Sequence, residues 1–189
     1  MTDFSNDIEQ CLKSLNEGEV ILYPTDTIWG LGCDATNPEA VRRLMNTKGK
    51  TPDKGLIILV ASERDILQHV AAPDLAVFDY LDTTAKPTTV IYDNGLNVAD
   101  EVLHADGSIA IRVVKDEFCR HLIKRFRKPI VSTSANIHGK PSPQNFAAIS
   151  HEIKDAVKYV VEFRRHEESG AQSSAIVRWQ NGHSQVLRP

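Results

Sequence analysis

Hydroxyl, amide and cationic side chains, the groups that bind phosphates and carboxylates, are concentrated in three short segments of this chain. Residues 24–34 (PTDTIWGLGCD) contain two threonines and two aspartates, residues 48–55 (KGKTPDKG) contain three lysines, and residues 132–139 (STSANIHG) contain three hydroxyls and an asparagine. In an open α/β sheet, loops at strand ends form the ligand crevice. Turn formation alone would explain any one of these segments, so the prediction of a shared site depends on all three.

The charge distribution favours a small anionic ligand. The net charge is −3. Residues 1–40 hold eight acids and one lysine, whereas residues 112–128 hold seven basic and two acidic residues. A second basic cluster lies within residues 42–54. An acidic protein with local basic clusters suits a nucleotide better than a long nucleic acid. The stretch 116–128 is equally explained as a solvated helix face, and it could also touch RNA.

Common cofactor and metal motifs are absent or misplaced. Residues 30–35 (GLGCDA) match the glycine pattern of dinucleotide-binding loops, but the next helix is predicted only near Asn37, so these glycines do not open a helix. Residues 49–51 (GKT) resemble the end of a P-loop that lacks its first glycine. The seven histidines show no metal-ligand spacing, and the three cysteines form no CxxC pair. We therefore expect no metal site from the protein alone and no disulfide framework.

The elements that must position these segments alternate between helix and strand. The first helix is predicted from apolar spacing over residues 8–15, with Asn6 and Glu9 as a capping pair, and a hairpin is predicted across Asn181-Gly182. Residues 24–36 are expected to form a loop. The predicted strands cover residues 20–23, 56–60, 88–92, 108–113, 129–132, 157–163, 174–179 and 184–188, and further helices are predicted to begin near residues 37, 62, 75, 118 and 142. This order predicts an α/β fold on a mixed, twisted sheet.

Length and composition limit the class of protein. At 189 residues, with 41% apolar and 25% charged residues, the chain has the size and balance of one globular domain. No apolar run approaches the roughly 18 residues of a membrane-spanning helix, and the N-terminus is acidic where a signal peptide would be basic. We therefore expect a cytoplasmic protein without membrane contact.

The three segments, in this order, resemble the YrdC family of threonylcarbamoyl-AMP synthases. The matching residues are 23–34 (YPTDTIWGLGCD), the lysines at 48, 50 and 54, residues 111–113 (IRV) and residues 132–139 (STSANIHG). The resemblance covers about residues 8–188. It implies a mixed twisted open sheet with helices on both faces and a deep cationic cavity, over residues 1–189 as a single domain. The additional C-terminal domain of longer members is not expected after Pro189.

The resemblance also implies an activity. Family members combine L-threonine, bicarbonate and ATP into threonylcarbamoyl-AMP and pyrophosphate, and other proteins transfer the threonylcarbamoyl group to an adenosine of tRNA. Magnesium is expected to arrive with ATP, and no prosthetic group is expected. Adenylyl transfer of this kind needs charge neutralisation and alignment more than a dedicated base. Cations and hydroxyls meet that need.

Matching positions carry the family's roles to individual residues. The resemblance assigns catalysis to Lys48, Lys50, Ser134 and Asn136, threonine binding to Thr27, Arg112 and Ser174, and ATP binding to Lys50, Lys54, Ser108, Ser132, Ser134, Ser142 and Arg188.

The chain departs from the family pattern at three places. Lys50 stands where the family usually has arginine, which keeps the charge but loses the planar fork. Residues 85–89 (AKPTT) replace a PGPxT segment, and residues 173–175 (SSA) replace PST. Two alternatives stay open: an RNA-binding module that uses residues 116–128, and an inactive paralogue. The presence of Lys48, Ser134 and Asn136 argues against the second.

Overall fold

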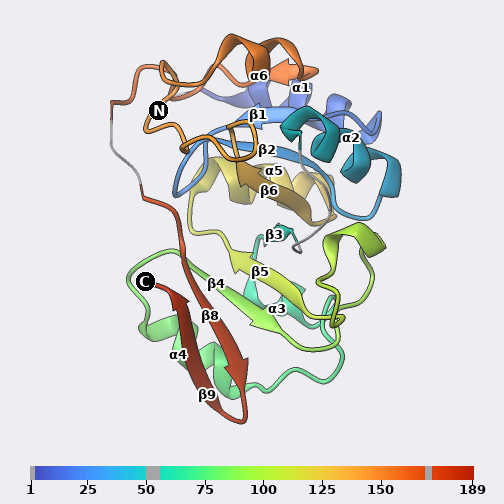
Figure 1. The fold of residues 1–189 in the computed structure, drawn as a ribbon, viewed down its shortest axis with the longest axis vertical. Helices are drawn as coiled ribbons and strands as arrows, with labels where there is room; N and C mark the ends of the chain where they lie inside the picture. The colour runs from blue at the N-terminus through green and yellow to red at the C-terminus, as the bar shows by residue number, and fades with distance from the viewer. Residues whose placement is uncertain (1–2, 50–55, 169–171) are drawn as a thin grey trace.

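The computed structural model describes residues 3–49, 56–168 and 172–189. These residues form one nine-stranded mixed sheet with helices packed against it (Figure 1). The helices are α1 (Ser5–Asn16), α2 (Pro38–Lys48), α3 (Glu63–Ile66), α4 (Ala76–Thr83), α5 (Glu117–Phe126), α6 (His151–Asp155) and the 3-10 helix η1 (Asp100–Val102). The strands are β1 (Ile21–Tyr23), β2 (Gly30–Asp34), β3 (Ile57–Val60), β4 (Thr88–Tyr92), β5 (Ile109–Val113), β6 (Ile130–Ser134), β7 (Tyr159–Val160), β8 (Ala175–Gln180) and β9 (His183–Arg188).

Strand order brings segments that are far apart in sequence into contact. The order is β7-β1-β2-β6-β3-β5-β4-β8-β9. Strand β6 lies between β2 and β3 and is antiparallel to both, with Gly30 opposite Ser134 and Ile57 opposite Ser132. The pairs β1–β7, β3–β5 and β4–β8 are parallel. This arrangement places the start of β2, the start of β3 and the end of β6 side by side.

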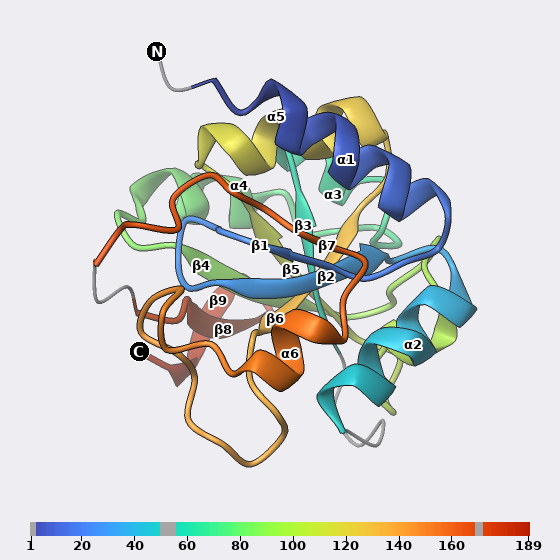
Figure 2. The same ribbon diagram turned by 90° about the horizontal axis from the view of Figure 1, so that it is seen from above.

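Helices cover both faces of the sheet. Figure 2 shows α1, α3 and α5 on one side and α2 and α6 on the other. The face of α5 that carries Phe118, Leu122 and Phe126 is buried, while its opposite face carries charged side chains, as an amphipathic helix requires. The structure confirms the predicted α/β class with its mixed sheet and helices on both faces. It also confirms the hairpin across Asn181-Gly182, because β8 and β9 pair antiparallel there.

The expectation of a loop over residues 24–36 was wrong for strand β2, which is buried along its whole length between β1 and β6. The strand was not predicted because two of its five residues are glycine, which is depleted in strands. Close packing explains Gly32: a Cβ there would lie 2.6 Å from Cε1 of Tyr23 and 3.0 Å from the carbonyl oxygen of Val131. The glycine lets the Tyr23 ring and the neighbouring backbone approach.

We expect Gly32→Ala to lower the free energy of unfolding by about 1–3 kcal/mol, the usual cost of overfilling a packed interior. Gly30→Ala is the matched control on the same strand, because the nearest atoms there would be 3.2 Å from the added Cβ, and its loss should be smaller. Urea unfolding of both variants measures the difference. Equal stability of Gly32→Ala and the parent would contradict the packing assignment.

Two helix boundaries also differ from expectation. The helix predicted to open at Ser142-Pro143 begins only at His151, with Ser150 as its N-cap. The segment before it is irregular, but it buries Ile149 and packs the Phe146 ring against Trp29 in a tilted arrangement. The apolar spacing there therefore reflects a loop that packs against the core, not a helix. At the N-terminus, Asn6 lies inside α1 and Phe4 is the N-cap residue, without a side-chain cap.

The three cysteines are buried free thiols, in agreement with the expectation of no disulfide framework. Burial raises the pKa of each thiol above its ordinary value, so all three stay protonated and pack as small apolar groups. Among the described helices, none combines the length and the apolar character that crossing a bilayer requires.

Candidate functional site

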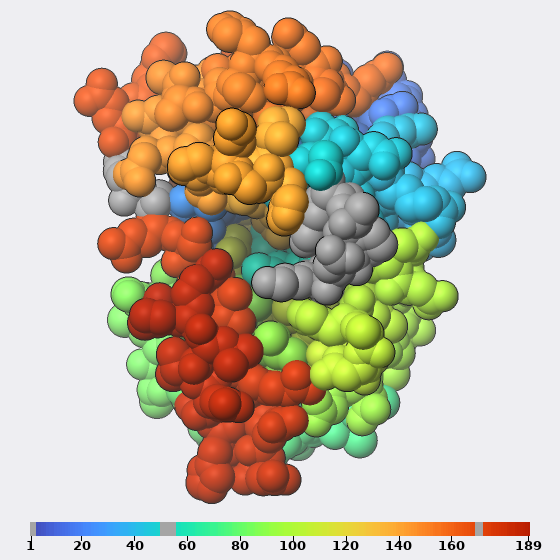
Figure 3. Space-filling model, in the orientation of Figure 1, coloured from blue at the N-terminus to red at the C-terminus, as the bar shows by residue number. Residues whose placement is uncertain are grey.

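A cavity of about 260 Å³ opens where β2, β3 and β6 meet the strands β5, β8 and β9. Figure 3 shows the hollow in the middle of one face, between the loops that follow β6 and the β8–β9 hairpin. Its polar lining consists of hydroxyls and two arginines, and no carboxylate lines it among residues 3–49, 56–168 and 172–189. The polar lining residues are Thr27, Arg112, Ser132, Thr133, Ser134, Ser142, Ser173, Ser174 and Arg188.

Thr27 presents a hydrogen-bond acceptor to the cavity. The Thr25 hydroxyl donates to the carbonyl of Ile28 at 2.8 Å, so its oxygen must accept from the Thr27 hydroxyl at 2.9 Å. The backbone N–H of Thr27 donates to the same Thr25 oxygen at 3.1 Å. With its own proton committed, Thr27 faces the cavity with lone pairs. A ligand N–H or O–H fits that position.

Arg112 supplies a buried cation with unused donors. The residue is 4% exposed, and its Nη2 lies 3.2 Å from Oδ1 of Asp26, which is an ion-pair distance. The guanidinium and the carboxylate are not oriented to form a hydrogen bond. Nε and Nη2 of Arg112 therefore have no hydrogen-bond partner among the described residues. A buried donor without a partner costs about 1–3 kcal/mol. An anionic ligand that accepts from this guanidinium would recover that cost.

Arg188 adds a second cation beside the first. Its Nε and Nη2 donate to the carbonyl of Ser174 at 3.0 and 2.8 Å, and the Ser174 hydroxyl hydrogen-bonds that of Thr89 at 2.8 Å. Burial, and then the charge of Arg112, lower the pKa of Arg188. Two guanidinium groups close enough to repel each other are stabilised by an anion between them.

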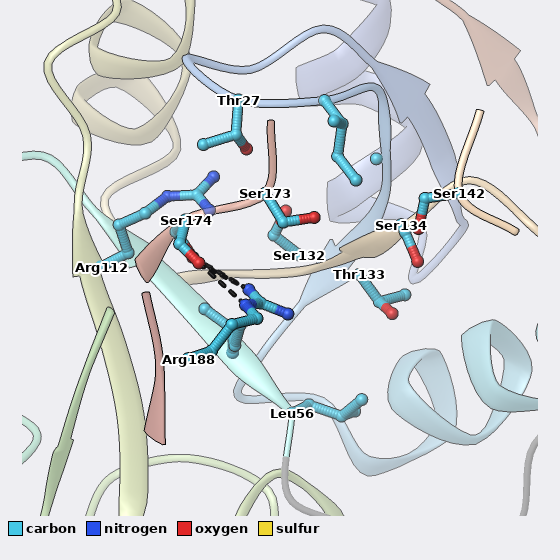
Figure 4. A pocket seen from close by; sticks show the side chains of 13 residues that line it. Thr27, Leu56, Arg112, Ser132, Thr133, Ser134, Ser142, Ser173, Ser174 and Arg188 are labelled. Carbon is cyan, nitrogen blue, oxygen red and sulfur yellow. Dashed lines mark hydrogen bonds between the residues drawn. The ribbon is translucent and has the colours of Figure 1, made fainter. Parts of the chain in front are cut away.

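The end of β6 forms the other side of the cavity. In Figure 4, Thr27, Arg112 and Ser174 lie at one end, while Ser134 and Ser142 lie at the other, with Ser132 and Arg188 between them. The two ends therefore differ in chemistry: one carries the buried cation Arg112 and the Thr27 acceptor, and the other carries hydroxyls.

Lys48 holds the chain that follows β6. Its side chain is buried, and its Nζ lies 2.7 and 3.2 Å from the carbonyl and hydroxyl oxygens of Ser134 and 2.9 and 3.1 Å from the carbonyl and amide oxygens of Asn136. The Asn136 amide nitrogen in turn donates to the carbonyls of Ile137 and Lys140. The C-terminus of α2 is thus fastened to the β6 loop, and three of the four residues predicted to be catalytic meet.

Not every predicted site residue lines the cavity. The Ser108 hydroxyl donates to the Asp106 carboxylate at 2.6 Å, and Ser108 is absent from the described lining; this internal hydrogen bond occupies the group that was predicted to contact ATP. Lys50 and Lys54 lie outside the described residues. The roles of all the predicted residues remain predictions.

Four residues that line the cavity or pair with its lining were not among the predicted site residues. Asp26 was quoted only as part of a motif, although its position between two threonines was a signal. Thr133 and Ser173 each adjoin a residue that was predicted. Gly30 was quoted only within motifs, such as residues 23–34, and it lines the cavity because β2 pairs with β6.

The lining offers no resident site for magnesium. No group of three or more His, Cys, Asp or Glu side chains suited to a metal occurs in the part of the chain that the structure describes. Hydroxyls and guanidinium groups are poor ligands for Mg²⁺, which prefers carboxylates, phosphates and water. The described lining therefore contains no side chains that would hold magnesium by themselves.

Comparison with known proteins places these features in one class. Residues 13–189 match the Sua5/YciO/YrdC model, which is described as telomere recombination. A threonylcarbamoyl-AMP synthase of Vibrio campbellii is 34% identical over 184 residues, 95% of this chain and 97% of that protein. The solution structure of MTH1692 from Methanobacterium thermoautotrophicum superposes with a TM-score of 0.70 at 30% identity, covering 100% of this chain and 89% of that one.

One matching crystal structure contains an amino acid. Sua5 of P. abyssi in complex with L-threonine superposes with a TM-score of 0.82 at 25% identity over 96% of this chain. This chain spans about half of that longer one, 53% of its length.

The fold and site define an α/β protein whose cavity, at a strand junction, is lined by the arginine and hydroxyl side chains that suit a small anion. The chain belongs to the Sua5/YciO/YrdC family, which confirms the resemblance seen in the sequence.

Proposed function

We propose that this chain is a threonylcarbamoyl-AMP synthase, which uses L-threonine, bicarbonate and ATP. The observation that carries the proposal is the buried Arg112 guanidinium, with two donors unpartnered among the described residues, at the same end of the cavity as the Thr27 acceptor. An α-amino acid has a carboxylate for the first and an N–H for the second. A relative that is named threonylcarbamoyl-AMP synthase, and that aligns with 95% of this chain, supports threonine as the substrate.

The reaction joins three substrates in two bond-forming steps. The threonine nitrogen attacks the carbon of bicarbonate, and loss of water leaves a carbamate. A carbamate oxygen then forms a bond to the α-phosphorus of ATP while the bond to pyrophosphate breaks. This second step needs alignment and neutralisation of charge more than proton transfer.

The cavity residues divide these tasks. Arg112 holds the threonine carboxylate, and Thr27 accepts a hydrogen bond from the threonine nitrogen, which fixes the direction of the carbamate. Arg188, the second cation of the cavity, faces the negative charge that develops at the α-phosphate. Charge stabilisation by prepositioned donors of this kind is often the largest single contribution to catalysis.

The nucleotide end is built from the β6 loop. We assign Ser132, Ser134 and Ser142 to hydrogen bonds with ATP, and Lys48 to holding Ser134 and Asn136 in place. Magnesium supplies charge neutralisation when it enters with the triphosphate. The product then leaves for the proteins that transfer the threonylcarbamoyl group to tRNA, which is the class of partner this activity requires.

Pyrophosphate release from ATP tests the proposal. We expect release only when threonine and bicarbonate are both present, because the carbamate is the nucleophile and neither component alone can form it. The measurement is a coupled pyrophosphate assay in carbon dioxide-free buffer, with bicarbonate added back. Serine and glycine are the controls for the amino acid. Equal release without an amino acid would overturn the proposal in favour of simple ATP hydrolysis, and no release under any of these conditions would favour an RNA-binding module.

A further inference from the structure

A second hollow, of about 460 Å³, lies away from the cavity described above. It is formed by the C-terminal half of α5, by α3 and the residues after it, and by the end of the sheet where the central strand β3 ends and β6 begins. None of its described lining residues lines the first cavity. Figure 2 shows α3 and α5 on the side of the sheet opposite to α2 and α6. The hollow is within the size range of small-molecule sites, about 300–1,000 Å³.

The floor of this hollow is apolar and its rim is cationic. Val60, Ala61 and Ile123 are buried beneath it, while Lys124 and Arg127 are exposed. No ion pair or side-chain hydrogen bond involves Lys124 or Arg127 among the described residues.

Two carboxylates near the hollow are already occupied. Lys128 pairs with the buried carboxylate of Asp34 at 2.6 Å. Asp65, which lines the hollow, accepts from the backbone N–H groups of Ala61 and Ser62 at 3.1 and 2.8 Å. Neither carboxylate is paired with Lys124 or Arg127, so these two cations are available to an anion such as a phosphate.

His69 adds a specific acceptor. The residue is 6% exposed and lines the hollow. Its Nδ1 lies 3.4 Å from the carbonyl oxygen of Leu96, and because a carbonyl only accepts, Nδ1 carries the proton. Burial lowers the pKa of His69, which keeps the ring neutral at pH 7. Nε2 therefore has a free lone pair, and no hydrogen bond reaches it among the described residues.

We infer that this hollow binds a nucleotide, with the phosphate on Lys124 and Arg127, the base on the apolar floor, and a base N–H donated to Nε2 of His69. Each part of the hollow matches one part of a nucleotide. The two cations can bind the phosphate, the buried aliphatic side chains can pack against the flat base, and the neutral acceptor can bind an amino group of the base. The nucleotide could be free or part of an RNA chain. Arg120 lies one turn before Lys124 on the exposed face of α5, at a spacing where the two side chains share one face.

Site-resolved binding tests the inference. The probes are AMP, ribose 5-phosphate and an oligoadenylate RNA, each titrated into ¹⁵N-labelled protein and followed by NMR. We expect saturable shifts of the backbone amides at residues 60–69 and 123–128 with AMP, separate from any shifts around Arg112. Ribose 5-phosphate should bind more weakly because it lacks the base. If the RNA binds more tightly than AMP, and its affinity falls steeply with salt, the ligand is a nucleotide within an RNA chain. If the two affinities are equal, the ligand is the free nucleotide.

Matched variants assign the contacts. Lys124→Gln/Arg127→Asn removes both charges, and asparagine suits the left-handed backbone at position 127, where φ is 59°. We expect AMP affinity at this site to fall at least about tenfold, whereas the charge-matched control Lys13→Gln/Lys158→Gln leaves it unchanged. His69→Asn retains a donor for the Leu96 carbonyl and removes Nε2, so it should weaken AMP but not ribose 5-phosphate.

Pyrophosphate release should stay within about twofold of the parent in these variants, since the site is separate from the first cavity. Absence of shifts at residues 60–69 and 123–128 with all three probes would overturn the inference. Shifts that persist unchanged in Lys124→Gln/Arg127→Asn would overturn it too.

Discussion

Replacing Arg112 with alanine should weaken threonine binding by about 30-fold to several thousand-fold and leave ATP binding within about threefold. Truncating one partner of a buried charged contact typically costs about 2–5 kcal/mol, and about 1.4 kcal/mol corresponds to a factor of ten. Arg112 is buried, and its Nε and Nη2 lack a hydrogen-bond partner among the described residues. Calorimetric titration with threonine and with a nonhydrolysable ATP analogue measures both affinities.

A folding defect must be separated from this loss. Asp26 lies 3.2 Å from Arg112, and removal of the arginine alone leaves a buried carboxylate without its ion partner, which is destabilising. The double variant Arg112→Gln/Asp26→Asn leaves no charge at either position. We expect it to fold and still to fail with threonine. Arg112→Lys should bind weakly, because an ammonium cannot form the bidentate fork. Unchanged threonine affinity in the double variant would move Arg112 out of the amino-acid site.

Lys48→Met should reduce the turnover number by about 100- to 1,000-fold, the usual effect of losing a prepositioned charged donor at an active site. Lys48 is 5% exposed, and its Nζ lies 2.7–3.2 Å from oxygens of Ser134 and Asn136. Without the ammonium, two carbonyls of the β6 loop lose a charged donor, and the serine and asparagine side chains lose their alignment. Steady-state pyrophosphate release gives kcat and KM.

The exposed Lys140 provides the matched control for this substitution. Lys140→Met removes one positive charge from the loop that Lys48 holds, without removing a buried contact, so turnover should stay within about twofold of the parent. If Lys48 acts by positioning, threonine affinity should be retained while kcat falls and the ATP KM rises. A Lys48→Met protein with parental turnover would show that the link between α2 and the β6 loop is dispensable.

The family and the chemistry of the site could be read from the sequence because they depend on local strings of residue types. Hydroxyls and cations clustered at residues 24–34, 48–55 and 132–139 predicted an anion site before any fold was known. Helix α2 began where Asn37 and Pro38 predicted, since Asn37 accepts from the N–H groups of Glu39 and Ala40. N-capping and proline at the first turn act within a few residues.

Strand β2 could not be predicted because its identity depends on its neighbours. Gly30 and Gly32 oppose strand formation locally, and only the packing of the Tyr23 ring and the pairing with β6 make glycine the residue that fits. The predicted helix after Ser142 was wrong for the converse reason. Its apolar spacing resembled a helix, but Phe146 and Ile149 find their partners across an irregular loop.

The sequence by itself determined the helices with local caps, the hairpin turn, and which residue types were available for catalysis. Only the tertiary structure decided which of those residues meet. Lys48, Ser134 and Asn136 come together because β6 lies between β2 and β3. Arg188 and Arg112 line the same cavity because β9 pairs with β8, which pairs with β4 beside β5. Ser108 carries the right hydroxyl but bonds to Asp106 within its own turn. Strand pairing joins distant segments through backbone hydrogen bonds that every residue type except proline can donate and accept, so residue types alone do not encode the partner.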